Sequence, residues 1–145
     1  METPEISKDI KQVIVMRKDL NMRKGKMVAQ GAHASMKVFF DMVREKYVDS
    51  SQDKITYGIN LPVGEMGKDI STWIEGIFKK VCCGVDSEED LLKVHIEAQE
   101  KGIPCALIKD AGITEFKGVH TYTCCAIGPA KAELVDEITG DLKLL

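Results

Sequence analysis

The chain has 145 residues, of which 44% are hydrophobic and 30% are charged, and its formal net charge is −3. This length fits one domain and this composition is ordinary for a soluble globular protein. No apolar run reaches the roughly 18 residues of a membrane span, the first ten residues are not a secretory signal, and the negative charge argues against general nucleic-acid binding. We expect residues 1–10 to form a short flexible lead and residues 11–145 to form the domain.

Positive charge is concentrated in the first third of the chain. Residues 1–47 hold ten Lys/Arg and six Asp/Glu, whereas residues 48–145 hold ten and seventeen. A local patch of this kind attracts a polyanion even when the whole chain is acidic, although a solvated loop has the same pattern. The cations lie closest together at Lys11, Arg17, Lys18, Arg23, Lys24 and Lys26.

The first half of the chain predicts two strands and two helices. Residues 12–17 are a continuous apolar run, typical of a buried strand. From Lys26 to about Lys46 apolar residues recur at helical spacing, which predicts a long amphipathic helix. Residues 49–69 mix Gly, Pro, Ser and Asp and predict an extended surface loop or a small hairpin. A short helix over 70–77 and a second strand over 78–85 follow.

The second half is more regular. Residues 86–102 predict a helix in which Ser87 is the N-cap, with Asp90 in the position of a capping-box acid and Gly102 after the last turn. Strands are expected at 104–110 and 120–128, and a last helix over 130–140. The order of elements predicts an α/β fold, a single compact domain in which helices cover both faces of a four-stranded mixed β-sheet.

The cysteines point to a structural role. All five lie in segments that predict strands, and we expect them to be small core residues in a reducing cytosol. No CxxC pair is present, so neither a zinc site nor a thioredoxin-type motif is indicated. The five are Cys82, Cys83, Cys105, Cys124 and Cys125.

Two charged residues that follow or end predicted strands indicate a candidate site. In an open α/β sheet, ligands bind beyond the carboxyl ends of the strands. Lys26 lies in the first turn of its helix, where the helix dipole disfavours a cation, and Asp110 ends the 104–110 strand. If the 12–17 and 104–110 strands are parallel, the two meet at one edge of the sheet. Gln30 and His33 share the helix face of Lys26.

Other interpretations of these residues remain open. His33 also fits a half-buried histidine beside small residues. Asp110 also fits a cap for the turn that follows it, with Thr114 as a local partner.

Three strings resemble the type 2 peptidyl-tRNA hydrolase family. GKMVAQGAHAS, preceded by VIVMRKDLNMRK, is similar to the family's start. GIPCALIKDAGITE resembles its central strand and the Asp-Ala-Gly-x-Thr turn, and CAIGPAKAELVDEITGDLKLL resembles its C-terminus. They occur in the family's order along the 145 residues.

The resemblance implies a compact α/β domain that is usually a homodimer in the cytoplasm. It implies hydrolysis of the ester that joins a peptide to the terminal ribose of tRNA, with no metal and no organic cofactor. The family's functional lysine, aspartate and threonine fall on Lys26, Asp110 and Thr114.

The resemblance also implies substrate-binding positions. Gln30 and His33 match polar helix positions that line the same cleft. A further threonine aligns with Thr123, with Thr121 as the competitor. We expect Lys18, Arg23 and Lys24 to contact tRNA phosphates.

The chain departs from the family at residues 49–69, which are longer than the usual link between the first two helices. We interpret this segment as a lid, a contact for the tRNA acceptor end or a loop that modifies the dimer. The chemistry itself is expected to be direct attack by water, since the matched strings hold neither a Ser-His-Asp nor a Cys-His arrangement.

Three rival functions are weighed against the hydrolase. The first is a catalytically inactive tRNA- or protein-binding module of the same fold. The second is a nucleotide-binding domain, against which the chain lacks both GxGxxG after its first strand and a P-loop. The third is a thiol enzyme, which requires an exposed cysteine with a lowered pKa.

Overall fold

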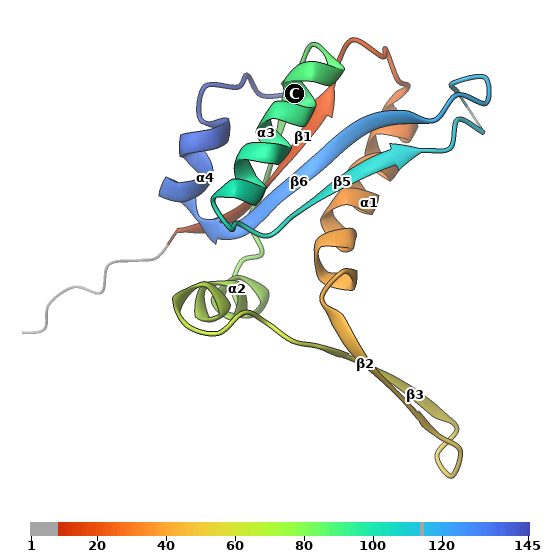
Figure 1. Cartoon of the computed structure of the whole chain (residues 1–145), viewed down its shortest axis with the longest axis vertical. Coiled ribbons are helices and arrows are strands. Elements are labelled where there is room, and N and C mark those ends of the chain that lie inside the picture. Colours follow the sequence, from red (N-terminus) through yellow and green to blue (C-terminus); the bar gives the residue numbers. More distant parts are fainter. Residues whose placement is uncertain (1–8, 114) are drawn as a thin grey trace, which may run out of the picture.

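A mixed sheet of four strands, in the order β4-β1-β6-β5, forms the centre of the chain (Figure 1). The computed structural model describes residues 9–113 and 115–145. β1 pairs in parallel with β4 and antiparallel with β6, and β6 pairs antiparallel with β5. β1 and β5 therefore point the same way on either side of β6. The strands are β1 (Ile10–Arg17), β4 (Lys80–Val85), β5 (Cys105–Asp110) and β6 (Thr121–Lys131).

Helices cover both faces of this sheet. α1 (Lys24–Phe40) packs on one face, and α3 (Glu88–Glu100) and α4 (Ala132–Thr139) pack on the other (Figure 1). Successive residues of a strand point to opposite faces, so a strand covered on both sides is apolar throughout. Val13, Val15, Cys125 and Ile127 accordingly face α3 and α4, and the residues next to them in sequence, Ile14, Met16, Cys124 and Ala126, face α1.

α2 (Glu65–Glu75) lies beyond the end of the sheet where β1 starts and β6 finishes (Figure 1). Its Trp73 is 3% exposed and joins three segments. The indole stacks on Phe39 of α1 at 5.7 Å and on Phe78 at 4.1 Å between ring centroids. Its Nε1 donates a hydrogen bond to the Lys79 carbonyl oxygen at 2.8 Å.

A two-stranded hairpin separates α1 from α2. β2 (Val43–Asp49) and β3 (Lys54–Ile59) pair antiparallel and project from the body of the molecule (Figure 1). The predicted hairpin between 49 and 69 is therefore present, but it starts at Val43 and the last five residues of that segment belong to α2. None of the described helices is long and apolar enough to cross a membrane.

The predicted α/β fold, with its four-stranded mixed sheet and helices on both faces, is confirmed. The prediction for the first helix was wrong at its C-terminal end, since α1 stops at Phe40 rather than near Lys46. Its last fully buried residue is Val38; Phe39 still packs at the margin of the core and on Trp73, and the chain then leaves the sheet. The β-branched and aromatic residues of the following segment pair as strands instead.

Smaller predictions are confirmed in detail. Ser87 is the N-cap of α3 and its Oγ accepts a hydrogen bond from the Asp90 N–H at 3.0 Å. Gly102 follows that helix with a φ of +68°, in the left-handed region that favours glycine. Ile10, which was predicted to end a flexible lead, is already part of β1; residues 1–8 lie outside the described residues.

The prediction that all five cysteines are core residues is confirmed at three positions, is met in part at Cys105 and was wrong at Cys82. Cys83, Cys124 and Cys125 are buried and Cys105 is half-buried, but Cys82 is exposed. β4 is an edge strand, and α1 does not extend over it. The side chain that β4 directs toward that face therefore meets solvent.

Replacing Trp73 with alanine should lower the free energy of unfolding by about 3–5 kcal/mol, because the change empties a buried site where three segments meet. Ile74→Ala, one residue along the same helix at a side chain that is 46% exposed, is the matched control and should cost far less. Urea unfolding followed by circular dichroism measures both, since Trp73 is the one tryptophan of the chain. Equal losses would show that the stack does not hold α2 in place.

Candidate active site

The start of α1 and the end of β5 bring a lysine and an aspartate together. Lys26 Nζ lies 2.9 Å from Asp110 Oδ1, and each side chain is only 13% exposed. The contact follows from the topology. β1 and β5 end at the same edge of the sheet, and α1 begins a few residues after β1, so its first turn stands beside the last residue of β5. The predicted meeting of Lys26 and Asp110 is therefore confirmed.

Gln30 continues this contact into the core. Its Nε2 donates to Asp110 Oδ1 at 3.2 Å, and its Oε1 accepts a hydrogen bond from Thr123 Oγ1 at 2.5 Å. Gln30 is 2% exposed and Thr123 is fully buried on β6. The Thr123 hydroxyl requires the amide oxygen on one side and the Asp110 carboxylate requires the amide nitrogen on the other. The Gln30 amide is therefore fixed in one of its two flipped orientations. Thr123 thus joins the network, whereas the hydroxyl of its competitor Thr121 donates to the Val119 carbonyl.

The second carboxylate oxygen of Asp110 is also occupied. Asp110 Oδ2 accepts a hydrogen bond from the Gly112 N–H at 2.8 Å. Gly112 has a φ of +79°, and a Cβ at this position would collide with the Val119 backbone, so the turn requires glycine. Asp110 therefore caps the turn that follows it, as the alternative interpretation predicted, and also contacts Lys26.

These contacts determine the charge state of Asp110. The hydrogen bond from Lys26 holds the pKa of the Asp110 carboxyl below its ordinary value, and the Gly112 N–H and Gln30 act in the same direction. Burial opposes the shift but is outweighed. At neutral pH Asp110 is therefore a carboxylate, in direct contact with Lys26 Nζ.

An aromatic ring that the sequence analysis did not single out borders the pair. Lys26 Nζ lies 5.6 Å from the centroid of the Phe116 ring, within the range of a cation–π contact. Phe116 also lines an open hollow together with Arg23 and Glu115. The feature of the sequence that could have identified Phe116 is an aromatic residue within the polar stretch that follows Asp110.

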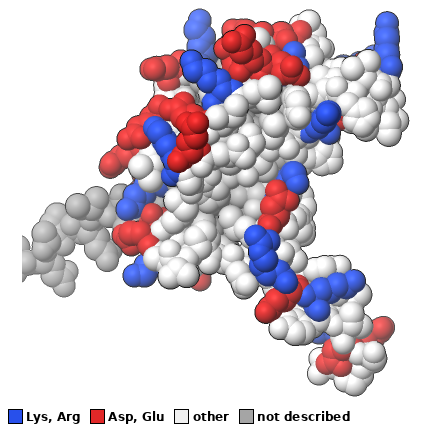
Figure 2. Space-filling view, in the orientation of Figure 1, with Lys and Arg blue, Asp and Glu red and all other residues white. Residues whose placement is uncertain are grey.

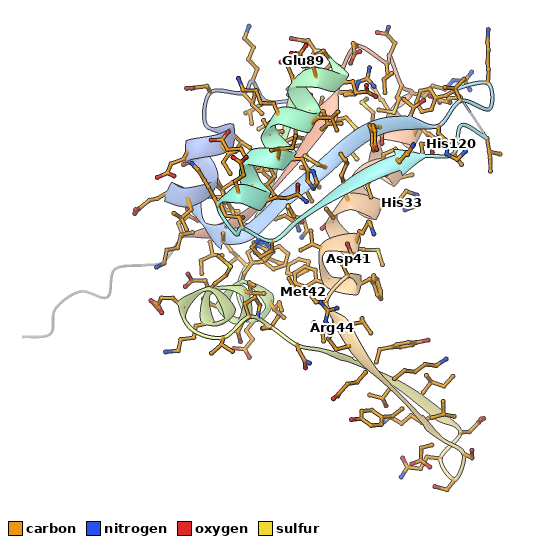
Figure 3. The ribbon with its side chains drawn as sticks, viewed as in Figure 1. His33, Asp41, Met42, Arg44, Glu89 and His120 are labelled. Carbon is orange, nitrogen blue, oxygen red and sulfur yellow. The ribbon has the colours of Figure 1, made fainter. Side chains whose placement is uncertain are left out.

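The remaining predicted residues are spread over the surface. His33 is exposed, not half-buried, and lines a separate groove with Phe40, Leu107 and Lys109, midway along α1 (Figure 3). In the described part of the chain it stays outside the Lys26–Asp110 network. Thr114 lies outside the described residues, so its predicted place beside Asp110 stays a prediction.

The predicted patch of cations does not form one surface. Lys11 pairs with Asp136 at 2.6 Å, at the opposite end of β1. Lys18 lies 3.4 Å from Asp86 and faces a cavity beside α3 and α4, whereas Lys24 is exposed along α1. Arg23 alone of the three predicted phosphate contacts borders the hollow next to Phe116. The sequence places these cations close together, but the alternation of β1 and the turn into α1 direct them apart.

Four of the five cysteines do not support a thiol enzyme. Burial raises the pKa of Cys83, of Cys105 and of Cys125, and it raises the pKa of Cys124 to about 12. A thiol nucleophile needs the opposite shift. Among the described residues, no three His, Cys, Asp or Glu side chains are placed to hold a metal ion.

The chain is similar to known proteins over nearly all of its length. A profile of the family described as peptidyl-tRNA hydrolase PTH2 matches residues 10–145. A protein of Methanocaldococcus jannaschii named peptidyl-tRNA hydrolase is 39% identical over 136 residues, which cover 94% of this chain and 100% of that protein. Proteins of the same name from Methanopyrus kandleri and Thermococcus onnurineus are each 38% identical over 135 residues, 93% of this chain and 97% of theirs.

Replacing Lys26 with methionine should raise the pKa of the Asp110 carboxyl, because the largest contribution to its lowered value is removed. In the wild type, the stability that Asp110 contributes is complete above the ordinary pKa of an aspartate and is lost as pH falls through the lowered, folded-state value. Titration of the Asp110 side-chain carboxyl by ¹³C NMR measures the shift. Lys24→Met, on the same helix but away from Asp110, is the control, and an unchanged Asp110 pKa in Lys26→Met would contradict the pairing.

Proposed function

The chain belongs to the peptidyl-tRNA hydrolase PTH2 family, and from this premise we propose that Lys26, Asp110 and Thr114 form its catalytic group. The chain is a hydrolase that cleaves the ester between peptide and tRNA by attack of water, which recycles the tRNA. The contact between Lys26 and Asp110 carries the assignment of residues, because it brings an ammonium group to the edge of the sheet where α/β proteins bind ligands.

Lys26 is the group that meets the developing negative charge. Attack of water on the ester carbonyl produces a tetrahedral oxyanion, and a donor fixed in advance near that oxygen lowers the barrier. The ammonium group suits this role because it is charged, mostly buried and held on one side by Asp110 Oδ1. When the intermediate collapses, the bond to the ribose oxygen breaks, the ribose oxygen takes up a proton and the peptide leaves as a carboxylic acid.

Asp110 acts chiefly as the group that positions Lys26. A carboxylate whose pKa is below the ordinary value is a weak base at neutral pH, and both of its oxygens already accept hydrogen bonds. Gln30 donates a hydrogen bond to the carboxylate and Thr123 donates one to Gln30, so both residues act by positioning Asp110. Thr114, four residues further along the chain, is assigned from the family resemblance to orient the attacking water.

Arg23 and Lys24 are proposed to contact tRNA phosphates on the side where α1 begins, with Lys18 further away. Arg23 lines the hollow next to Phe116, which supports an approach of the acceptor end from this side. At the same edge, the opposite face of the sheet is unfavourable for a polyanion, because acidic residues gather at the start of α3, around Glu89 (Figures 2 and 3). His33, one groove further along α1, is kept as a proposed contact of the substrate.

The resemblance further supports a homodimer that works in the cytoplasm, without a cofactor. An apolar groove on the α1 side of the sheet is consistent with assembly of two copies. The alternative function, an inactive module that binds tRNA or protein, predicts binding without release of the peptide.

Lys26→Ala and Asp110→Ala should each slow the hydrolysis of N-acetyl-aminoacyl-tRNA by at least about 100-fold, because each removes the fixed ammonium group or the group that holds it. Release of the N-acetyl-amino acid is measured at saturating substrate, with folding checked by circular dichroism. Lys37→Ala, at an exposed lysine of the same helix that pairs with Asp41, should retain the wild-type rate. A wild type that binds tRNA but releases nothing would leave the binding module as the function.

Arg23→Gln and Lys24→Gln should weaken tRNA binding and lower the slope of log affinity against log salt by about one for each phosphate that the variant no longer neutralises. The rate at saturating substrate should change little, since neither side chain takes part in the chemistry. Lys101→Gln is the control, because Lys101 pairs with Glu97 and Glu137 at the far end of α3. If all three variants kept the salt slope of the wild type, the tRNA would bind elsewhere on the surface.

A further inference from the structure

The hairpin of β2 and β3, called the arm below, is the part of the fold that the proposed mechanism does not use. It leaves the body where α1 ends, with Asp41, Met42 and Arg44 at its root (Figures 1 and 3). The root is closed by a hydrogen bond from the Asn60 N–H to the Met42 carbonyl at 3.3 Å. Beyond it the two strands bond to each other and extend away from the sheet. A hairpin of two strands is at best marginally stable alone in water.

One face of the arm is mainly apolar, although Lys46 lies on it opposite Tyr57, with its Nζ 6.0 Å from the centroid of the Tyr57 ring. The register places Val48 opposite Ile55 and Val43 opposite Ile59, and Tyr57 lies between the two isoleucines on the same side. Val48 is 65% exposed, and Ile55 and Tyr57 are 57% and 58% exposed. The other face is largely polar and charged. A contiguous apolar surface of this kind on a soluble domain marks an interaction site.

The charge and position of the arm argue against tRNA as its partner and against a lid. Arg44, Lys46 and Lys54 are balanced by Glu45, Asp49 and Asp53, and both signs are visible on the arm (Figure 2). A surface without net charge does not attract phosphates. The arm also begins at the far end of α1 from Lys26. Since α1 has 17 residues, its two ends are about 25 Å apart.

The same chain carries an apolar groove that none of its described residues fills. It lies between α1 and the edge strand β4 and has a volume of about 700 Å³. Val28 and Met36 of α1 are 73% and 55% exposed on its wall, and Phe78 is 47% exposed opposite them. The groove exists because β4 is the edge strand and α1 leaves that part of the sheet uncovered. The exposed Cys82 lies within it.

The arm and the groove match in length as well as in polarity. The groove follows α1 from Lys24 to Phe39, about 23 Å at 1.5 Å per residue. The seven residues of β2 span about 23 Å at 3.3 Å per residue. The arm points away from its own body (Figure 1), so the two surfaces of one chain do not meet.

We propose that the arm of one copy lies in the α1–β4 groove of a second copy, with its apolar face against Val28, Met36 and Phe78. The reciprocal contact then closes a twofold dimer, because each copy supplies one arm and one groove. The inference rests on the proposed homodimer and names the surfaces that would form it. It assigns the segment that departs from the family's length to assembly, not to the chemistry.

The native thiol in the groove provides a direct test. In a Cys105→Ser background, which leaves Cys82 as the exposed cysteine of the described chain, cysteine is introduced singly at Val48, Ile55 or Tyr57 on the apolar face. The matched controls are Tyr47→Cys and Thr56→Cys on the opposite face. After a short bismaleimide reagent is added, covalent dimers on denaturing gels should form from the apolar-face set. Adding Cys82→Ser should abolish them.

Sedimentation of the arm variants separates this inference from the proposed dimer. Val48→Asp combined with Ile55→Asp, and removal of residues 43–59 with Met42 joined to Asn60 through two glycines, should both give monomers, whereas Thr56→Asp should remain a dimer. Dimers that persist without the arm, or cross-links that do not require Cys82, would overturn the inference and leave the homodimer intact. A wild type that is monomeric throughout would overturn both, and hydrolysis by that monomer would leave the assigned activity standing.

Discussion

A single carboxylate, that of Asp110, organises the site, and most of its stability as an ion comes from neighbours on other elements. A buried charge is unfavourable unless it is paired and hydrogen-bonded. Asp110 meets this condition with Lys26 and Gln30 from α1 on one oxygen and the Gly112 N–H on the other. Because each donor fixes a different segment, the carboxylate joins the start of α1, the end of β5 and the turn after it.

The topology of the sheet makes this convergence possible. β6 runs antiparallel between β1 and β5, so those two strands end at the same edge and β6 starts there. Each of the three strands contributes to the site at that edge. β1 leads into α1 and Lys26, β5 ends in Asp110, and β6 supplies Thr123 near its beginning. The buried Thr123 hydroxyl holds the Gln30 amide in place, and the amide in turn holds the Asp110 carboxylate.

The proposed functions of the chain lie at different positions along α1. Its first two turns carry Lys26 and Gln30, its outer flank forms one wall of the apolar groove, and the arm begins where it ends. A change in the arm is therefore about 25 Å from the Lys26–Asp110 contact, by the rise of an α-helix. This separation explains how an additional hairpin is accommodated without disturbing that contact.

The sequence by itself determined the elements, the family and the central pair of the site. Continuous apolar runs predicted strands covered on both faces, Ser87 and Gly102 marked the ends of α3, and a lysine in the first turn of a helix indicated that it has an anionic neighbour. These signals are local, or they depend only on the direction of parallel strands. The spacing of apolar residues placed the end of α1 too late, because where a helix stops depends on whether the sheet still lies beneath it.

Tertiary structure decided which of the remaining candidates meet. Cations adjacent in sequence point to different surfaces, so Lys11 and Lys18 pair with acids away from the site. His33 shares a helix face with Lys26 but emerges beside the edge of β5, and Phe116 reaches Lys26 through a loop whose path no periodicity reveals. Cys82 is exposed because α1 does not extend over β4, whose outer edge pairs with residues 143–145. In each case the deciding quantity is what packs against the residue, and that depends on segments far away in the chain.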